Sequence, residues 1–224
     1  MNPANWLLLF PVSLLLPLAL GVVRFRKAPM AYRVLTIYLV YSLLSDAFTI
    51  TLYFLNVPNL WFWGIYGTGE LLLLALCFYY LLPHPIIRFS IGIAALLFLS
   101  YLVATRVFSG EPIQVLGNVQ VMESAIIVLY ALVYFVWIYR DPMRFREMAS
   151  ANFSLVAGLI WYFSGNLLFY SVARAIYHDP ELSLWKFYFF HNINHLVMNL
   201  LMARAFWQLP KSIAPMHPVQ SSKP

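Results

Sequence analysis

Residues Phe187 to Trp207 have the sequence FYFFHNINHLVMNLLMARAFW, and this stretch decides how the chain folds. It is long and apolar enough to cross a lipid bilayer as a helix, which takes about 20 residues. Its middle nevertheless carries five polar side chains, those of His191, Asn192, Asn194, His195 and Asn199. A polar group in hydrocarbon costs free energy unless it finds a partner. The stretch therefore predicts a membrane helix whose polar face lies against other helices.

The composition of the whole chain supports the same class of protein. The chain has 224 residues, of which 62% are hydrophobic and 10% are charged, and its mean hydropathy is +0.77. A soluble domain that apolar would aggregate, so we expect a polytopic protein of the cell membrane, in bacteria the inner membrane. The net charge of +6 comes from basic residues in short connections and in the tail. That distribution is typical of topology signals and not of a nucleic-acid surface, so no nucleic-acid partner is expected.

The sequence predicts an all-α bundle of seven membrane-spanning helices. Seven apolar segments approach the length of a span, and they cover Asn5–Val23, Ala31–Leu55, Leu60–Leu82, Ile86–Thr105, Val119–Tyr139, Ala151–Tyr177 and Leu182–Trp207. The connections are short and contain proline, so neighbouring helices should pack antiparallel. We expect one domain over residues 1–209, followed by a disordered cytoplasmic tail over residues 210–224, which are rich in proline and serine.

The basic residues predict the orientation of the bundle. They gather after the first, third, fifth and seventh segments, at Arg24, Arg26, Lys27, Arg33, Arg88, Arg140, Arg144, Arg146, Arg204, Lys211 and Lys223. The connections on the other side hold fewer basic residues, mixed with acidic ones. Because cytoplasmic loops carry an excess of Lys and Arg, the N-terminus should lie outside and the C-terminus in the cytoplasm.

Ionisable side chains at membrane depth are the most informative feature of the sequence. They are Asp46, Glu70, Glu123, His191 and His195, and no Lys or Arg lies near the middle of any segment. Carboxylates buried without a basic partner cannot all remain charged and isolated. They must be protonated, be hydrogen-bonded in a network, face water, or face a cation.

Helical phase and depth predict that the polar residues share one cavity. With a rise of about 1.5 Å per residue, they fall at similar depths in the outer half of the bilayer, on faces that can point inward. We expect a ligand-binding cavity open to the outside, with Glu70 and His195 close together, lined by Asp46, Tyr66, Glu70, Glu123, Asn166, His191 and His195. The alternative is a closed structural network, in which the asparagines hold the helices together.

A metal site is one form that this cavity can take. His191 and His195 are four residues apart, so both imidazoles lie on one helix face, as in helical metal sites. With Glu70 and Glu123 they would form a site of two histidines and two carboxylates for zinc, iron or manganese. Retinal is not expected, because the only lysine of the last segment, Lys186, is near its outer end. A nucleotide is not expected either, because the chain has no Gly-rich phosphate loop.

Three stretches carry a resemblance to known proteins. They are IYGTGELLLLALCFYY (Ile65–Tyr80), LIWYFSGNLLFYS (Leu159–Ser171) and HNINHLVMNLLMARAFW (His191–Trp207), and they resemble motifs of small bacterial seven-helix membrane proteins that have no assigned function. The resemblance implies the seven-helix fold and gives weight to Glu70, Asn166 and His191, but it implies no activity. The layout is also similar to that of G-protein-coupled receptors, whose motifs in the third and seventh helices are absent here, so that likeness is one of layout alone.

These observations favour a non-enzymatic receptor or sensory module. A small polar, cationic or metal ligand would bind among Glu70, Glu123 and His191, and a membrane or cytoplasmic partner protein would carry the signal. The first alternative is an intramembrane metal-dependent lipid hydrolase, in which one carboxylate activates water. The second alternative is a small transporter or proton-coupled carrier, in which the carboxylates take up protons.

Overall fold

The structure is a computed structural model that describes residues 3–57, 60–82, 84–108, 112–140, 149–177 and 184–210. These residues form seven helices, namely α1 (Pro3–Arg24), α2 (Met30–Phe54), α3 (Leu60–Leu81), α4 (Pro85–Phe108), α5 (Pro112–Arg140), α6 (Ala149–Tyr177) and α7 (Leu184–Trp207). The prediction of an all-α chain with seven helices is confirmed, and the predicted boundaries agree to within a few residues, apart from the earlier start of α5. The predicted disordered tail lies outside the described residues, except for Pro210.

Proline residues set several of the helix boundaries. Pro85 and Pro112 are the first residues of α4 and α5. Proline suits that position because its missing N–H would have no partner within the helix. Pro29 precedes α2 in an extended conformation, with φ −56° and ψ 158°. After α2, Asn56 has a φ of 54°, a left-handed conformation that asparagine tolerates, and the chain leaves the helix there.

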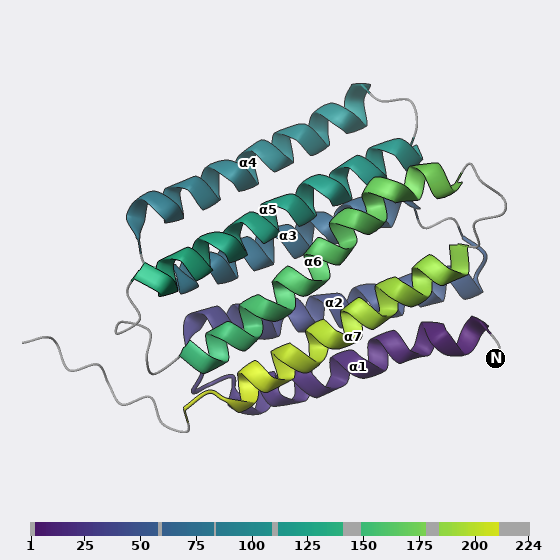
Figure 1. Ribbon diagram of the computed structural model, residues 1–224. Coiled ribbons are helices and arrows are strands. Elements are labelled where there is room, and N and C mark those ends of the chain that lie inside the picture. Colours follow the sequence, from purple (N-terminus) through teal and green to yellow (C-terminus); the bar gives the residue numbers. More distant parts are fainter. Residues whose placement is uncertain are drawn as a thin grey trace, which may run out of the picture.

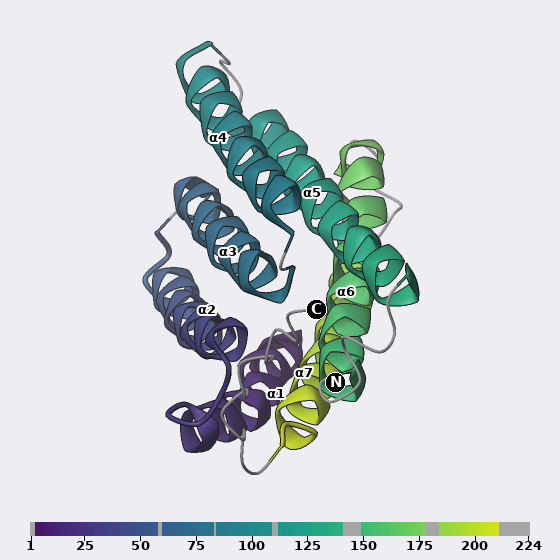
Figure 2. The ribbon, with the colours of Figure 1, turned by 90° about the vertical axis from the view of Figure 1, so that its left-hand side faces the viewer.

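Six of the helices form a closed ring. Neighbours in the ring pack in the order α1, α2, α3, α5, α6 and α7, and α7 in turn packs against α1. α4 lies outside the ring, against α3 and α5 (Figure 2). The axes of all seven helices are roughly aligned along the bundle (Figure 1). The helices therefore cross the same layer side by side. The five helices that carry predicted site residues all line the interior of the ring.

In the part of the chain that the structure describes, five helices are long and apolar enough to cross a membrane. These spans are Met30–Phe54, Gly64–Leu81, Pro85–Thr105, Gly117–Arg140 and Ser150–Ser171. Within the described residues α1 contributes a shorter apolar helix, Val12–Arg24. α7 is not among the five, and its polar middle accounts for that. Five such helices in one chain indicate a multi-pass membrane protein surrounded by lipid.

The distribution of side chains is also that of a protein dissolved in lipid. Large apolar side chains are exposed along the outer faces, for example those of Phe89, Leu96 and Leu168, and polar side chains are buried inside. The buried polar residues are Thr36, Ser42, Ser45, Glu70, Gln120, Glu123, Ser124, Asn152, Ser154, Asn166, Asn194, His195 and Asn199. A soluble protein buries its apolar side chains and rarely buries carboxylates, so the interior of this bundle is where function has to be sought.

Candidate functional site

Two carboxyl groups from different helices meet inside the ring. Glu70 projects from α3 and is 2% exposed, and Glu123 projects from α5 and is fully buried. Their side chains are close enough to interact electrostatically. Close approach of the two helices depends on Gly67, one turn before Glu70, because a Cβ atom there would lie 2.7 Å from Glu123 Oε2. The sequence thus brings the two carboxyl groups together by leaving room for one of them on α3.

Tyrosine hydroxyls surround Glu70. The hydroxyl of Tyr38 on α2 donates to Glu70 Oε1 over 2.7 Å, and that of Tyr66 donates to the same oxygen over 3.3 Å. The Tyr66 hydroxyl also lies 3.4 Å from Ser42 Oγ. Tyr41 stacks on Tyr66 with 5.8 Å between the ring centroids, which holds the Tyr66 ring in place. Glu70 is therefore arranged as a hydrogen-bond acceptor.

Glu123 has a different environment. Neither of its carboxyl oxygens accepts a hydrogen bond from an N–H or O–H group of the described residues. Gln120, one turn earlier on α5, is 5% exposed, and its amide nitrogen Nε2 also has no hydrogen-bond partner among them. A Cβ atom added to Gly67 would lie 2.8 Å from that nitrogen and 2.7 Å from Glu123 Oε2. Two buried polar groups with unused hydrogen-bonding capacity therefore face the same point on α3.

Each of the two imidazoles has an amide side chain as a hydrogen-bonding partner. His191 Nδ1 on α7 lies 2.9 Å from Asn166 Oδ1 on α6. His195 Nδ1 lies 3.1 Å from the amide nitrogen of Asn199, one turn further along α7, and that nitrogen also donates to Ser13 Oγ on α1 over 2.8 Å. These contacts join α6, α7 and α1, and they place each imidazole in a network of polar partners.

Tyr162 on α6 connects the carboxyl groups with the imidazoles. Its ring centroid lies 5.7 Å from that of His191 and 5.0 Å from that of His195, and the ring is buried. The same side chain is within electrostatic range of Glu70 and Glu123. Tyr162 therefore lies between the two sets of residues, and direct proximity of Glu70 and His195 stays a prediction.

The predicted residues all lie on helices of the ring, but they fall into two groups. Tyr66, Glu70 and Glu123 form one group, and Asn166 with the histidines forms the other. Asp46 is half-buried on α2, within electrostatic range of Glu70 and Tyr66. The opening of this interior toward the outside stays a prediction.

The structure gives no support to the predicted metal site of Glu70, Glu123, His191 and His195. Within the described residues, which include all four, no group of three or more His, Cys, Asp or Glu side chains is placed to hold a metal ion. The physical reason lies in the nearer partners of each group. The two carboxyl groups lie near each other. The Nδ1 atoms of His191 and His195 are hydrogen-bonding partners of the amide groups of Asn166 and Asn199.

Besides Gln120, two tyrosines of the site were missing from the predicted lining, Tyr38 and Tyr162. Tyr38 lies one turn before Ser42 and two turns before Asp46, so it shares their face of α2. Tyr162 lies one turn before Asn166 on α6. The four-residue spacing from a predicted polar residue was in both cases the signal that could have identified them, but tyrosine is common in apolar cores and the signal was weak.

Comparisons with protein-family models, with curated proteins and with solved structures found no match. A helical layout hosts many unrelated activities, and the function has to be argued from the site.

Proposed function

We propose that the chain is a receptor-type membrane protein that binds a small cation at the carboxyl pair, defined as Glu70 and Glu123. The observation that carries the proposal is the full burial of Glu123 with two oxygens that accept no hydrogen bond from the described residues. A buried acidic group with unused acceptor capacity costs free energy unless a positive charge or a proton satisfies it. A cation bound between the two carboxyl groups would satisfy it.

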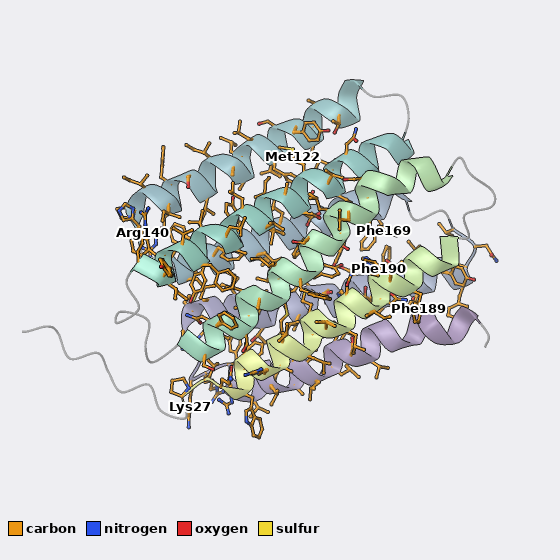
Figure 3. The ribbon with its side chains drawn as sticks, viewed as in Figure 1. Lys27, Met122, Arg140, Phe169, Phe189 and Phe190 are labelled. Carbon is orange, nitrogen blue, oxygen red and sulfur yellow. The ribbon has the colours of Figure 1, made fainter. Side chains whose placement is uncertain are left out.

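The residues around the pair suit a cation. Tyr38, Tyr66 and Tyr162 place aromatic rings and phenol oxygens beside the carboxyl groups. Aromatic faces attract ammonium groups, and phenol and carboxyl oxygens are ligands for alkali ions. The described Lys and Arg residues all lie at or within a few residues of helix ends, as Lys27 and Arg140 illustrate (Figure 3), so none of them is expected beside the pair. A small organic ammonium ion or an alkali ion is therefore the ligand class that fits.

The proposal includes a topology of seven spans with the N-terminus outside. Its support is the charge distribution, because Lys27 and Arg140 lie at the same end of the bundle, away from Phe169 and Phe189 (Figure 3). Reporter fusions after Lys27 and after Trp207 test it. Both should report the cytoplasm, and a periplasmic signal at either position would contradict the topology. A partner protein at that end would carry the signal of the receptor.

Thermal unfolding of the purified protein in lipid nanodiscs tests cation binding. The probes are sodium, potassium, tetramethylammonium and zinc chloride at constant ionic strength. A cation at 100 times its dissociation constant stabilises the folded state by about 2.7 kcal/mol. We expect a clear rise in the melting temperature with at least one of the probes.

The variants Glu70→Gln and Glu123→Gln should abolish that rise, because each removes a ligand while keeping the size of the side chain. Asp46→Asn, which removes a nearby carboxyl group outside the pair, should keep most of it. If no cation shifts the melting temperature of the unchanged protein, or if the rise persists in both Gln variants, the proposal is wrong. A loss of stability on adding chelator would identify the cation as a divalent metal ion.

A proton-coupled carrier is the second candidate function, and the pairing of two buried carboxyl groups favours it. Carboxyl groups inside the membrane mark proton relays in pumps and transporters. In proteoliposomes a carrier would move protons with the cation across the membrane, whereas a receptor would bind the cation without moving it. Metal-dependent hydrolysis gains no comparable support, since the described residues do not assemble its metal ligands.

A further inference from the structure

The two carboxyl groups of the pair differ in their hydrogen-bond partners, and this difference bears on where a proton resides. Glu70 Oε1 accepts hydrogen bonds from the hydroxyls of Tyr38 and Tyr66, at 2.7 Å and 3.3 Å. Glu123 receives none from the described residues, although it is fully buried and close enough to Glu70 to interact with it electrostatically. Glu70 therefore has the donors that a carboxylate needs, and Glu123 lacks them.

A hydrogen bond between two carboxyl groups requires a proton on one of them. If Glu70 carried it and Glu123 were ionised, the charge would sit on the group with no other donor. If Glu123 carries it, its O–H donates to Glu70, whose charge is then stabilised by three donors. Hydrogen bonds to an ionised acceptor are about twice as strong as neutral ones, so the second arrangement has the lower free energy.

Gln120 provides a second and independent observation. Its amide nitrogen is buried, has no hydrogen-bond partner among the described residues, and lies with Glu123 Oε2 at the same point of Gly67. A protonated Glu123 uses its O–H toward Glu70 and keeps its carbonyl oxygen as an acceptor. The Gln120 amide nitrogen nevertheless makes no hydrogen bond to Glu123. An ionised Glu123 would bind such a neighbouring donor strongly, so the unbonded amide agrees with a neutral Glu123.

Among the described residues, no cationic side chain faces the carboxyl pair, where it would stabilise a charge on Glu123. The titratable groups facing the pair are phenols and one carboxyl group, those of Tyr38, Tyr41, Tyr66 and Tyr162 and of Asp46. The imidazoles of His191 and His195 lie beyond Tyr162 and bind amides. On α4, the Arg88 guanidinium donates to the carbonyls of Tyr79 and Leu82, at the end of α3.

We infer that Glu123 is the proton-binding residue of the pair and that Glu70 is its ionised acceptor, so that the bundle holds one exchangeable proton at this point. A cation that enters the pair displaces that proton: the O–H bond of Glu123 breaks, its electron pair stays on the carboxylate, and the proton leaves to bulk water. Only this displacement rests on the proposed function.

Infrared difference spectroscopy near neutral pH tests the assignment, because a protonated carboxyl group has a C=O stretching band that a carboxylate lacks. The proteins compared are the unchanged protein, Glu123→Gln, Glu70→Gln and, to identify any band from the other membrane carboxyl group, Asp46→Asn. We expect the band to disappear in Glu123→Gln and to persist, shifted, in Glu70→Gln. The amide of the new glutamine can still donate to Glu70 in the first variant, so both variants keep a bonded pair.

Loss of the band in Glu70→Gln with retention in Glu123→Gln would reverse the assignment, and absence of the band from the unchanged protein would overturn it. If Glu123→Gln does not fold, Glu70→Gln decides alone, in protein whose glutamates carry a ¹³C carboxyl label. A band that behaves as expected in a protein that binds no cation would refute the proposed function and leave this assignment standing. Cation binding by a protein whose infrared band does not distinguish Glu123 from Glu70 would support the proposed function and refute this assignment.

Discussion

The two groups of polar side chains inside the ring differ in how they are hydrogen-bonded. The imidazole group, defined as Ser13, Asn166, His191, His195 and Asn199, joins α1, α6 and α7 through contacts of 2.8–3.1 Å. The carboxyl group, defined as Tyr38, Tyr66, Glu70, Gln120 and Glu123, joins α2, α3 and α5. Among the described residues, both oxygens of Glu123 and the amide nitrogen of Gln120 have no hydrogen-bond partner, whereas in Asn199 of the imidazole group only Oδ1 lacks one and the amide nitrogen is bonded. Both groups are enclosed by apolar helices.

This difference separates a structural network from a candidate binding site. Buried polar groups that are bonded to each other rigidify a core and specify how its helices pack. Buried polar groups without partners cost free energy, and a native protein keeps them where a ligand or a proton will use them. We therefore expect substitutions in the imidazole group to change mainly stability, and substitutions in the carboxyl group to change mainly binding.

The largest effect is expected for His195→Ala. This change empties the space of a fully buried imidazole and takes the Nδ1 acceptor from the Asn199 amide. Loss of packing together with an unpaired polar group should cost about 2–4 kcal/mol of unfolding free energy. Thermal unfolding in nanodiscs measures the loss, and Asn192→Ala, at a half-buried position of the same helix, is the control.

The same variant separates the two groups functionally. Cations that stabilise the unchanged protein should still stabilise His195→Ala by a similar increment, measured from its lower melting temperature. Loss of that increment would mean that the imidazoles belong to the cation site, and the division between the two groups would then be wrong.

A smaller effect is expected for Tyr38→Phe, compared with Tyr130→Phe. The first change removes a hydroxyl that donates to Glu70 over 2.7 Å, and the second removes one that donates to the backbone carbonyl of Ile91 over 3.3 Å. Hydrogen bonds to charged groups contribute about 1.5–3 kcal/mol and neutral ones about 0.5–1.5 kcal/mol. Tyr38→Phe should therefore lower stability more and should also weaken cation binding, while Tyr130→Phe should leave binding unchanged. Equal losses in the two variants would argue that Glu70 is not ionised.

Much of the fold could be predicted from the sequence because it depends on local properties. Apolar runs of bilayer length and the prolines between them were enough to place seven helices. Four-residue spacing, together with the rise per residue, was enough to bring the polar faces into one interior. The position of α4 outside the ring could not be predicted in this way, since none of the predicted site residues lies on that helix to specify its neighbours.

The pairing of the site residues could not be predicted, because it depends on which side chain is nearest. The spacing of His191 and His195 correctly placed both on one helix face. It carried no information about Asn166 or Asn199, whose amides take the imidazole nitrogens. Similarly, the sequence identified Glu70 and Glu123 as buried carboxyl groups, but their contact depends on the absence of a side chain at Gly67 on the facing helix.

The smallest effect on stability, and the sharpest on the site, is expected for Gly67→Ala. The new Cβ atom would lie 2.7 Å from Glu123 Oε2 and 2.8 Å from Gln120 Nε2, so both side chains must move. Because these atoms are the ends of flexible side chains, they can shift at little cost, and alanine favours the helix over glycine by up to about 1 kcal/mol. The net change in stability should be within about 1 kcal/mol. The cation-dependent rise in melting temperature should disappear, since the carboxyl groups of Glu70 and Glu123 would no longer be in contact.

Gly92→Ala is the matched control, because a Cβ atom on that glycine of α4 has nothing within 4 Å. It should gain the same helix preference and keep the full cation response. If Gly67→Ala also kept that response, contact between Glu70 and Glu123 would not be what binds the cation, and the carboxyl group would differ from the imidazole group in bonding alone.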